Sequence, residues 1–108
     1  MSNNELNILF TELFGIYIEE SKFRKFAFKK KFIKILSKLK GKELYNTLSK
    51  VVEVLDSKDL SHYKNLKYDL KKYKRVHVNS SYVILFYDDK TKKVYFVDYS
   101  HHDKIYKK

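Results

Sequence analysis

Alternating residues near position 76 place an arginine and a histidine side by side on one face of a predicted strand. Val76 and Val78 share the apolar face of this strand, so Arg75 and His77 project from the other face. Apolar faces pack against helices, and we therefore expect the guanidinium and the imidazole to lie on the side of the sheet away from the helices.

The C-terminal segment adds groups of the same kind. It contains His101, His102 and Tyr106, and the predicted strand before it delivers them to the same sheet. In RNA cleavage one group deprotonates a ribose 2′-hydroxyl, another protonates the leaving oxygen, and cations stabilise the pentavalent phosphate. Imidazole, guanidinium and phenol on a basic surface are suited to that chemistry.

Other interpretations of these side chains stay open at this point. A zinc site could use His77, His101 and His102, although the chain has no Cys ligand and lacks the usual paired spacing. His62 falls in a loop, where solvation or a local hydrogen bond accounts for it. The tyrosines of the predicted strands favour sheet packing over base stacking; they are Tyr82, Tyr87, Tyr95 and Tyr99.

The charge of the chain is high and unevenly distributed. The 108 residues include 24 Lys or Arg and 13 Asp or Glu, for a net charge of +11. Residues 1–21 contain four acids and no Lys or Arg, so the remainder carries +15. This density implies a polyanionic partner: nucleic acid, a ribonucleoprotein surface, an acidic protein or an anionic membrane. A lysine-rich proteome is the alternative explanation, since 22 of the 24 cations are Lys.

Composition excludes several classes of protein. The chain has no Cys, which rules out disulfides and thiolate metal sites and fits a reducing, cytoplasmic compartment. Gly15 and Gly41 are its two glycines, too few for a Gly-rich phosphate loop. The apolar run Tyr82–Tyr87 is too short to cross a bilayer, and the acidic start is unlike a signal peptide.

Hydrophobic periodicity predicts an α+β fold. An acidic amphipathic helix over residues 4–17, within an N-terminal unit 1–21, precedes a basic domain, 22–108. In that domain we expect a helical hairpin on one face of a small antiparallel sheet that ends in a meander. The predicted segments are a strand at 23–28, helices at 29–40 and 43–55, a loop at 56–72, strands at 73–78, 82–87 and 93–99, and a short tail or single helical turn from 100 to 108.

Residues 22–108 resemble the RelE/ParE superfamily, the toxins of type II toxin–antitoxin systems. The likeness is to its YafQ-like branch of mRNA interferases. Four segments carry it: Tyr63-Lys64-Asn65-Leu66-Lys67-Tyr68, Tyr73-Lys74-Arg75-Val76-His77-Val78, Tyr82-Val83-Ile84-Leu85-Phe86 and Asp98-Tyr99-Ser100-His101-His102-Asp103-Lys104-Ile105-Tyr106. The C-terminal stretch is the most specific of them. The helix Lys29–Leu39 also fits the first helix of the family.

The resemblance implies an endoribonuclease that enters the ribosomal A site and cuts the bound mRNA without a metal. The 2′-hydroxyl would attack the adjacent phosphate and leave a cyclic phosphate and a free 5′-hydroxyl. By position, His77 and His102 are the catalytic imidazoles, Tyr106 is the aromatic partner of His102, and Arg75 holds the scissile phosphate. The backbones of mRNA and ribosomal RNA would be bound by five lysines: Lys64, Lys67, Lys71, Lys72 and Lys74. The expected protein partner is an acidic antitoxin.

The chain departs from the YafQ-like pattern in several places. Asn65-Leu66-Lys67 stands where that pattern has a further histidine, Ser80 or Ser81 replaces an Asp, and His101 could act in place of His102. ParE-like members poison gyrase and lack the His-rich site, so the histidines argue against that branch. The alternative function is a non-catalytic toxin or an RNA- or protein-binding module on the same fold. The helix within residues 1–21 either enlarges the core or occupies part of the groove for the antitoxin.

Overall fold

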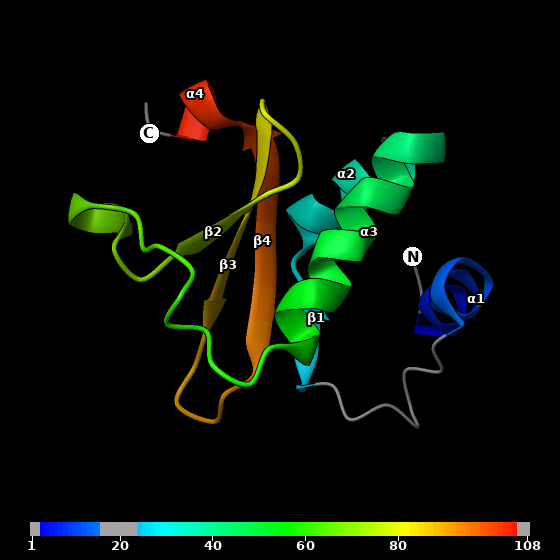
Figure 1. Cartoon of the computed structure of the whole chain (residues 1–108), viewed down its shortest axis with the longest axis horizontal. Helices are drawn as coiled ribbons and strands as arrows, with labels where there is room; N and C mark the ends of the chain where they lie inside the picture. The colour runs from blue at the N-terminus through cyan, green and yellow to red at the C-terminus, as the bar shows by residue number, and fades with distance from the viewer. Residues whose placement is uncertain (1–2, 16–23, 106–108) are drawn as a thin grey trace.

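The computed structural model describes residues 3–15 and 24–105, and its elements follow the predicted order (Figure 1). They are α1 (Asn3–Phe14), β1 (Phe26–Phe28), α2 (Lys30–Lys38), α3 (Gly41–Asp56), the 3₁₀ turn η2 (Tyr68–Leu70), β2 (Lys74–His77), β3 (Tyr82–Asp88), β4 (Val94–His101) and α4 (His102–Ile105). Within the described residues, no helix combines the length and hydropathy that a membrane span requires.

The four strands form one sheet in the order β1-β4-β3-β2. β2, β3 and β4 make the predicted antiparallel meander. β1, however, pairs in parallel with β4, so the sheet is mixed and our prediction of a wholly antiparallel sheet was wrong. The helical hairpin is a long crossover that leaves β2 parallel to β1, and the two reversals between β2 and β4 restore that direction.

α2 and α3 cover one face of the sheet (Figure 1). Each helix has apolar side chains on one side and lysines on the other, and the apolar sides meet the sheet because burial removes them from water. The fully buried centre of the core between the helices and the sheet comprises Phe32, Leu36, Leu48, Val51, Val54, Ile84, Phe86, Val94 and Phe96. This is the layered α+β arrangement that the sequence predicts.

The opposite face of the sheet is covered in part by the segment that joins α3 to β2. Leu66 of this segment is buried against Val83 and Leu85 of β3, and Leu70 and Tyr73 pack around them. β3 is therefore buried on both faces, which explains why Tyr82–Tyr87 is apolar throughout rather than alternating. In Figure 1 this segment and α4 lie on the side of the sheet away from α2 and α3.

α1 packs beside the helical hairpin. Phe10 is fully buried in the same core cluster as α2 and α3, and the ring of Phe14 lies 5.2 Å from that of Tyr45 in α3. The helix ends at Phe14, where Gly15 takes a positive φ and donates its N–H to the Thr11 carbonyl. Residues 16 and 17 of the predicted helix lie outside the described residues. The packing of Phe10 is what the core interpretation of this helix requires.

Candidate active site

β2 presents Arg75 and His77 on the face of the sheet opposite the helices, as the alternation predicts. Val76 between them is buried in the helix-side core, whereas His77 is exposed. Arg75 pairs with Leu85 and His77 with Val83, the two β3 residues buried on the other face. Two residues apart on one strand, the two side chains are separated by about 7 Å along the strand.

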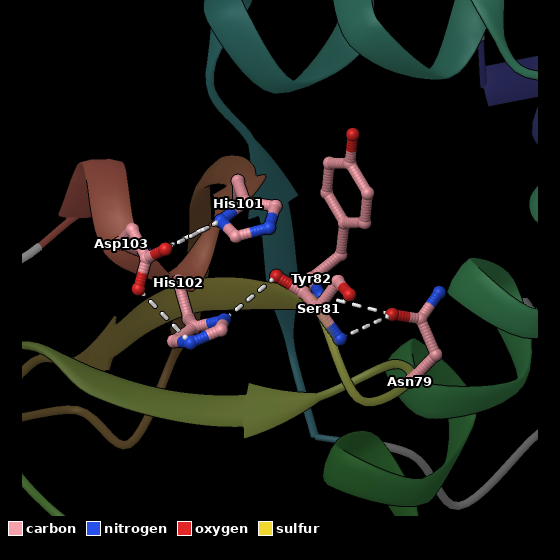
Figure 2. A network of polar contacts seen from close by, with 6 residues as sticks. All are labelled: Asn79, Ser81, Tyr82, His101, His102 and Asp103. Atoms are coloured by element: carbon pink, nitrogen blue, oxygen red, sulfur yellow. Dashed lines mark hydrogen bonds and ion pairs between the residues drawn. The ribbon is translucent and has the colours of Figure 1, made fainter.

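His102 is held at the start of α4 by the turn between β2 and β3. The carbonyl oxygen of Ser81 accepts the backbone N–H of His102 at 2.8 Å and lies 3.1 Å from its Nδ1 atom (Figure 2). A carbonyl can only accept, so Nδ1 carries the hydrogen of this bond and Nε2 is the nitrogen left to exchange a proton. Nε2 lies 3.1 Å from Oδ1 of the exposed Asp103, which pairs with the ring when it is protonated.

The Ser81 carbonyl is itself positioned by Asn79. The side-chain oxygen of Asn79 accepts the backbone N–H groups of Ser81 and Tyr82 at 2.8 and 2.9 Å (Figure 2). An Asn side chain that bonds the backbone two residues further on stabilises a tight turn. Asn79 therefore stabilises the β2–β3 turn, and the Ser81 carbonyl of that turn holds His102 in position.

His101 has different surroundings from His102. Its ring stacks on that of His102 at 4.8 Å and meets the edge of Tyr82 at 5.5 Å, and its Nδ1 atom accepts the N–H of Asp103 at 3.3 Å. Tyr82 stacks in turn on Tyr99, which is buried on the helix side. His101 thus connects the His102 ring to the rings of Tyr82 and Tyr99, whereas His102 is in addition hydrogen-bonded to the β2–β3 turn.

Strand pairing brings His77 and His102 to the same end of the sheet. His77 pairs with Val83, and Val83 pairs with Ser100, two residues before His102. Two strand spacings, about 10 Å, therefore separate the backbones of His77 and Ser100. Neither histidine points into the core: His77 is exposed, and the side chain of His102 is 37% exposed. Tyr106, the predicted partner of His102, lies outside the described residues.

Three of the predicted cationic residues line one cleft on this face. Lys64, Lys67 and Arg75 surround a cavity of about 600 Å³ beside the 3₁₀ turn. The other lining residues are Asn65, Leu66, Tyr68, Asp69 and Leu70. A cleft with three cations favours an anionic ligand.

The remaining predicted lysines are arranged differently. Lys72 places its ammonium 5.0 Å from the Tyr73 ring centre and 5.1 Å from that of Tyr87. Lys74 donates hydrogen bonds to the Tyr63 carbonyl at 3.2 Å and to Oδ1 of Asn65 at 3.0 Å. Lys71 is exposed. Lys74 therefore has a structural task that the sequence does not reveal.

Asn65 belongs to the segment Asn65-Leu66-Lys67, which stands where the YafQ-like pattern was expected to have a histidine, and its side chain closes the loop. Its Nδ2 atom donates to the carbonyl of Lys71 at 2.9 Å while its Oδ1 atom accepts from Lys74. Both ends of the amide are used inside the loop. Asn65 thus holds the cleft in shape, a role that does not replace the missing imidazole.

The buried tyrosine of β4 is a packing residue. Tyr99 is 9% exposed, and burial raises the pKa of its phenol. A raised pKa keeps the phenol neutral at physiological pH, so Tyr99 is unsuited to act as a base. Its stacking on Tyr82, with rings 5.1 Å apart and nearly parallel, agrees with the sheet-packing prediction for these tyrosines.

One group of residues in the described part of the chain has the composition of a metal site. Side-chain donor atoms of His101, His102 and Asp103 all lie within 4.8 Å of one another. Imidazole and carboxylate ligands of this kind suit Zn²⁺ or Cu²⁺. In the zinc alternative considered above, Asp103 thus takes the place of His77, which is not in this group.

Comparison with known proteins gives one line of evidence from sequence and another from structure. No protein-family model matches the chain. A protein of Methanocaldococcus jannaschii named "Putative toxin RelE4" is 44% identical over 79 residues, which cover 72% of this chain and 82% of that protein.

Solved structures of toxins share the fold of this chain. The RelBE toxin–antitoxin complex of E. coli matches with a TM-score of 0.59 at 20% identity, over 72% of this chain and 95% of the other. YafQ of E. coli matches with a TM-score of 0.56 at 18% identity, over 77% of this chain and 98% of the other. At these identities the structural matches establish the fold alone, and the 44% identity to the Methanocaldococcus jannaschii protein is the evidence of relationship.

Proposed function

Because the chain belongs to the RelE superfamily of type II toxins, we propose that it is an endoribonuclease that cleaves mRNA in the ribosomal A site and so inhibits translation. The observation that carries the proposal is the imidazole of His102, anchored to the Ser81 carbonyl at the same end of the sheet as His77, which lies two residues along β2 from Arg75 of the basic cleft. The neighbouring Arg75 and His77 on β2 supply the other groups that the reaction needs.

The proposed reaction is an intramolecular transesterification at the phosphorus atom. A base takes the proton of the ribose 2′-hydroxyl, and that oxygen attacks the adjacent phosphorus. The bond from phosphorus to the 5′-oxygen breaks, and an acid protonates the leaving oxygen. The products are a 2′,3′-cyclic phosphate and a free 5′-hydroxyl, and no metal takes part.

The proposed roles are those that the resemblance implies, and the positions of the side chains support them. His77 and His102 supply the base and the acid between them, and His102 acts through Nε2 because its Nδ1 hydrogen is committed to Ser81. Arg75 faces the same side and stabilises the charge that develops on the phosphate. Tyr106 keeps its predicted role as the aromatic partner of His102.

The basic residues of the loop hold the RNA. Lys64 and Lys67 line the cleft next to Arg75 and would contact phosphates of the mRNA. Lys71 and Lys72, which flank the cleft in sequence, would contact mRNA or ribosomal RNA. Lys74, whose ammonium is engaged within the loop, contributes mainly by holding that loop in place.

The proposed protein partner is an acidic antitoxin. A body with a net charge of +15 attracts an acidic chain, and one of the matching structures is a toxin–antitoxin complex. Since the proposed substrate is mRNA on ribosomes, we propose that the protein acts in the cytoplasm.

The test is primer extension on an mRNA in a cell-free translation reaction, with and without ribosomes. It compares the wild type with His77→Ala and His102→Ala, and His62→Ala is the matched control because His62 is an exposed histidine of the loop. We expect cuts in register with codons that require ribosomes, persist in the control and disappear in the other two variants.

Each other outcome assigns a different function. Cutting without ribosomes would keep the nuclease and remove the A-site mechanism. Translation that is inhibited equally by wild type and both variants, without any cut, would establish a non-catalytic toxin instead.

A further inference from the structure

Tyr68 is an aromatic side chain that the fold leaves in solvent. Among the large hydrophobic side chains in the described residues it is the most exposed, at 88%, against 55% for Ile8 and 44% for Tyr45. A tyrosine normally buries most of its ring. Tyr68 therefore presents a free aromatic surface.

The backbone of Tyr68 adopts a conformation that tyrosine disfavours. Its φ is +61°, in the left-handed region that is adopted mainly by glycine, asparagine and aspartate. Such strain persists only where the surroundings enforce it, and it is concentrated at functional sites.

The surrounding loop supplies that enforcement. The N–H of Leu66 donates to the Tyr73 carbonyl at 3.0 Å, and the side chain of Asn65 donates to the Lys71 carbonyl at 2.9 Å. Leu66 itself is buried between the loop and β3. The turn is thus clamped on both sides of Tyr68, and the ring is held outward at the cost of backbone strain.

Tyr68 is one of the residues that line the basic cleft. Lys64, Lys67 and Arg75 line the same cavity of about 600 Å³ as Tyr68. An aromatic face beside cations is the combination that binds single-stranded nucleic acid, because bases stack on the ring while phosphates meet the charges.

We propose that Tyr68 is the stacking platform for one nucleobase of the RNA substrate. This inference rests on the proposed function in one respect, that the ligand of the cleft is single-stranded RNA. The base lies on the phenol ring, and its phosphate lies towards Lys64 and Arg75 and away from the carboxylate of Asp69, which lines the cleft as well.

The experiment measures binding of the full-length protein to a ten-nucleotide single-stranded RNA that carries the fluorescent base 2-aminopurine. The variants are Tyr68→Ala, Tyr68→Gly, Tyr68→Phe and Tyr68→Trp. Ile8→Ala is the matched control because it removes an exposed apolar side chain from α1 without changing the charge. Affinity is measured at several salt concentrations, and melting temperatures are recorded for all variants.

We expect Tyr68→Ala and Tyr68→Gly to bind about 5- to 150-fold more weakly and to lose the quenching of 2-aminopurine. Tyr68→Phe, Tyr68→Trp and Ile8→Ala should bind like the wild type. The dependence of affinity on salt should not change, since no charge is removed. Tyr68→Gly should also melt at a higher temperature, because glycine relieves the strain at a positive φ.

Two results would overturn the proposal: wild-type affinity and quenching in Tyr68→Ala, or a weaker affinity in Tyr68→Phe and Tyr68→Trp equal to that of Tyr68→Ala. The two proposals fail separately. Loss of binding in Tyr68→Ala with no cleavage of mRNA by the wild type would support the platform and refute the nuclease. Normal binding in Tyr68→Ala with cleavage by the wild type would do the reverse.

Discussion

The Nδ1 atom of His102 lies 3.1 Å from the backbone carbonyl oxygen of Ser81. This bond joins the end of β4 to the turn between β2 and β3, and it fixes the tautomer of the imidazole. Since a backbone carbonyl cannot be removed by substitution, the bond is tested through the side chain that positions it.

Asn79→Ala should impair cleavage without impairing RNA binding. The substitution removes the oxygen that accepts the N–H groups of Ser81 and Tyr82, so the Ser81 carbonyl and the His102 ring lose their fixed positions. We expect kcat to fall about 10- to 100-fold, in line with the cost of a small misplacement of a catalytic group. KM should stay close to the wild-type value in the ribosome-dependent cleavage assay.

The exposed Asn46 of α3 provides the control, because Asn46→Ala removes the same side chain from a different element. If Asn79→Ala changed KM and left kcat intact, Asn79 would be a binding residue, and the positioning role assigned to it would be wrong.

The lysines of the loop should separate into two kinds. Lys64→Ala and Lys67→Ala should each weaken RNA binding and reduce the slope of log affinity against log salt by about 1. Lys74→Ala should instead lower the free energy of unfolding by about 1 kcal/mol, because its ammonium bonds the Tyr63 carbonyl and the Asn65 side chain.

Urea denaturation and salt-dependent binding measured on the same preparations distinguish the two effects. A full unit lost from the salt slope in Lys74→Ala, at unchanged stability, would return Lys74 to the set of phosphate contacts.

Local patterns predict the part of the site that depends on one strand. The alternation from Arg75 to Val78 suffices to place Arg75 and His77 on the face away from the helices, because neighbouring side chains of a strand point in opposite directions. The apolar run of β3 likewise identifies the central strand. Both features follow from a few consecutive residues.

Tertiary relationships could not be predicted in the same way. The bond of Ser81 to His102 depends on the register of β3 against β4, and the parallel pairing of β1 depends on a crossover of more than forty residues. The sequence around Tyr68 does not reveal its positive φ, because that conformation is imposed by hydrogen bonds between residues on the two sides of the turn. The structural role of Lys74 depends on the same folded loop.

The burial of Phe10 predicts that α1 stabilises the domain. The side chain is fully buried in the core cluster, so Phe10→Ala should cost about 3–5 kcal/mol in free energy of unfolding. Ile8→Ala, on the exposed side of the same helix, should change stability by less than about 0.5 kcal/mol. Urea denaturation measures both.

A fully stable Phe10→Ala variant with raised toxicity would contradict the core interpretation. It would favour the other interpretation, in which the helix occupies part of the groove for the antitoxin.

Asp89 should make stability depend on pH in the acid range. The hydroxyl of Thr91 donates to its carboxylate, and this bond, opposed by desolvation and aided by the N–H of Lys93, holds the pKa of Asp89 below its ordinary value. A lowered pKa in the folded state contributes stability above the unfolded value, about 3.9, and this contribution is lost as the pH falls through the folded value.

Asp89→Asn should therefore melt below the wild type at pH 7, and the difference should shrink towards pH 3. Thermal unfolding at pH 7, 5 and 3 measures it, with Asp88→Asn at the exposed neighbouring position as the control. A difference that stays constant down to pH 3 would show that the carboxylate charge contributes nothing to the turn.

The proposed chemistry uses no metal, and it predicts how metals and chelators should affect cleavage. A chelator that removes Zn²⁺ and Cu²⁺ but spares the Mg²⁺ required by ribosomes should leave the rate unchanged. Added Zn²⁺ should inhibit, because donor atoms of His101, His102 and Asp103 lie within 4.8 Å of one another, and a metal bound there would occupy the Nε2 atom of His102. Asp103→Asn should reduce this inhibition by removing one ligand and should leave Nδ1 of His102 bonded to Ser81. Loss of cleavage on chelation, restored by Zn²⁺, would instead make the three residues a catalytic metal centre and would replace the acid–base mechanism.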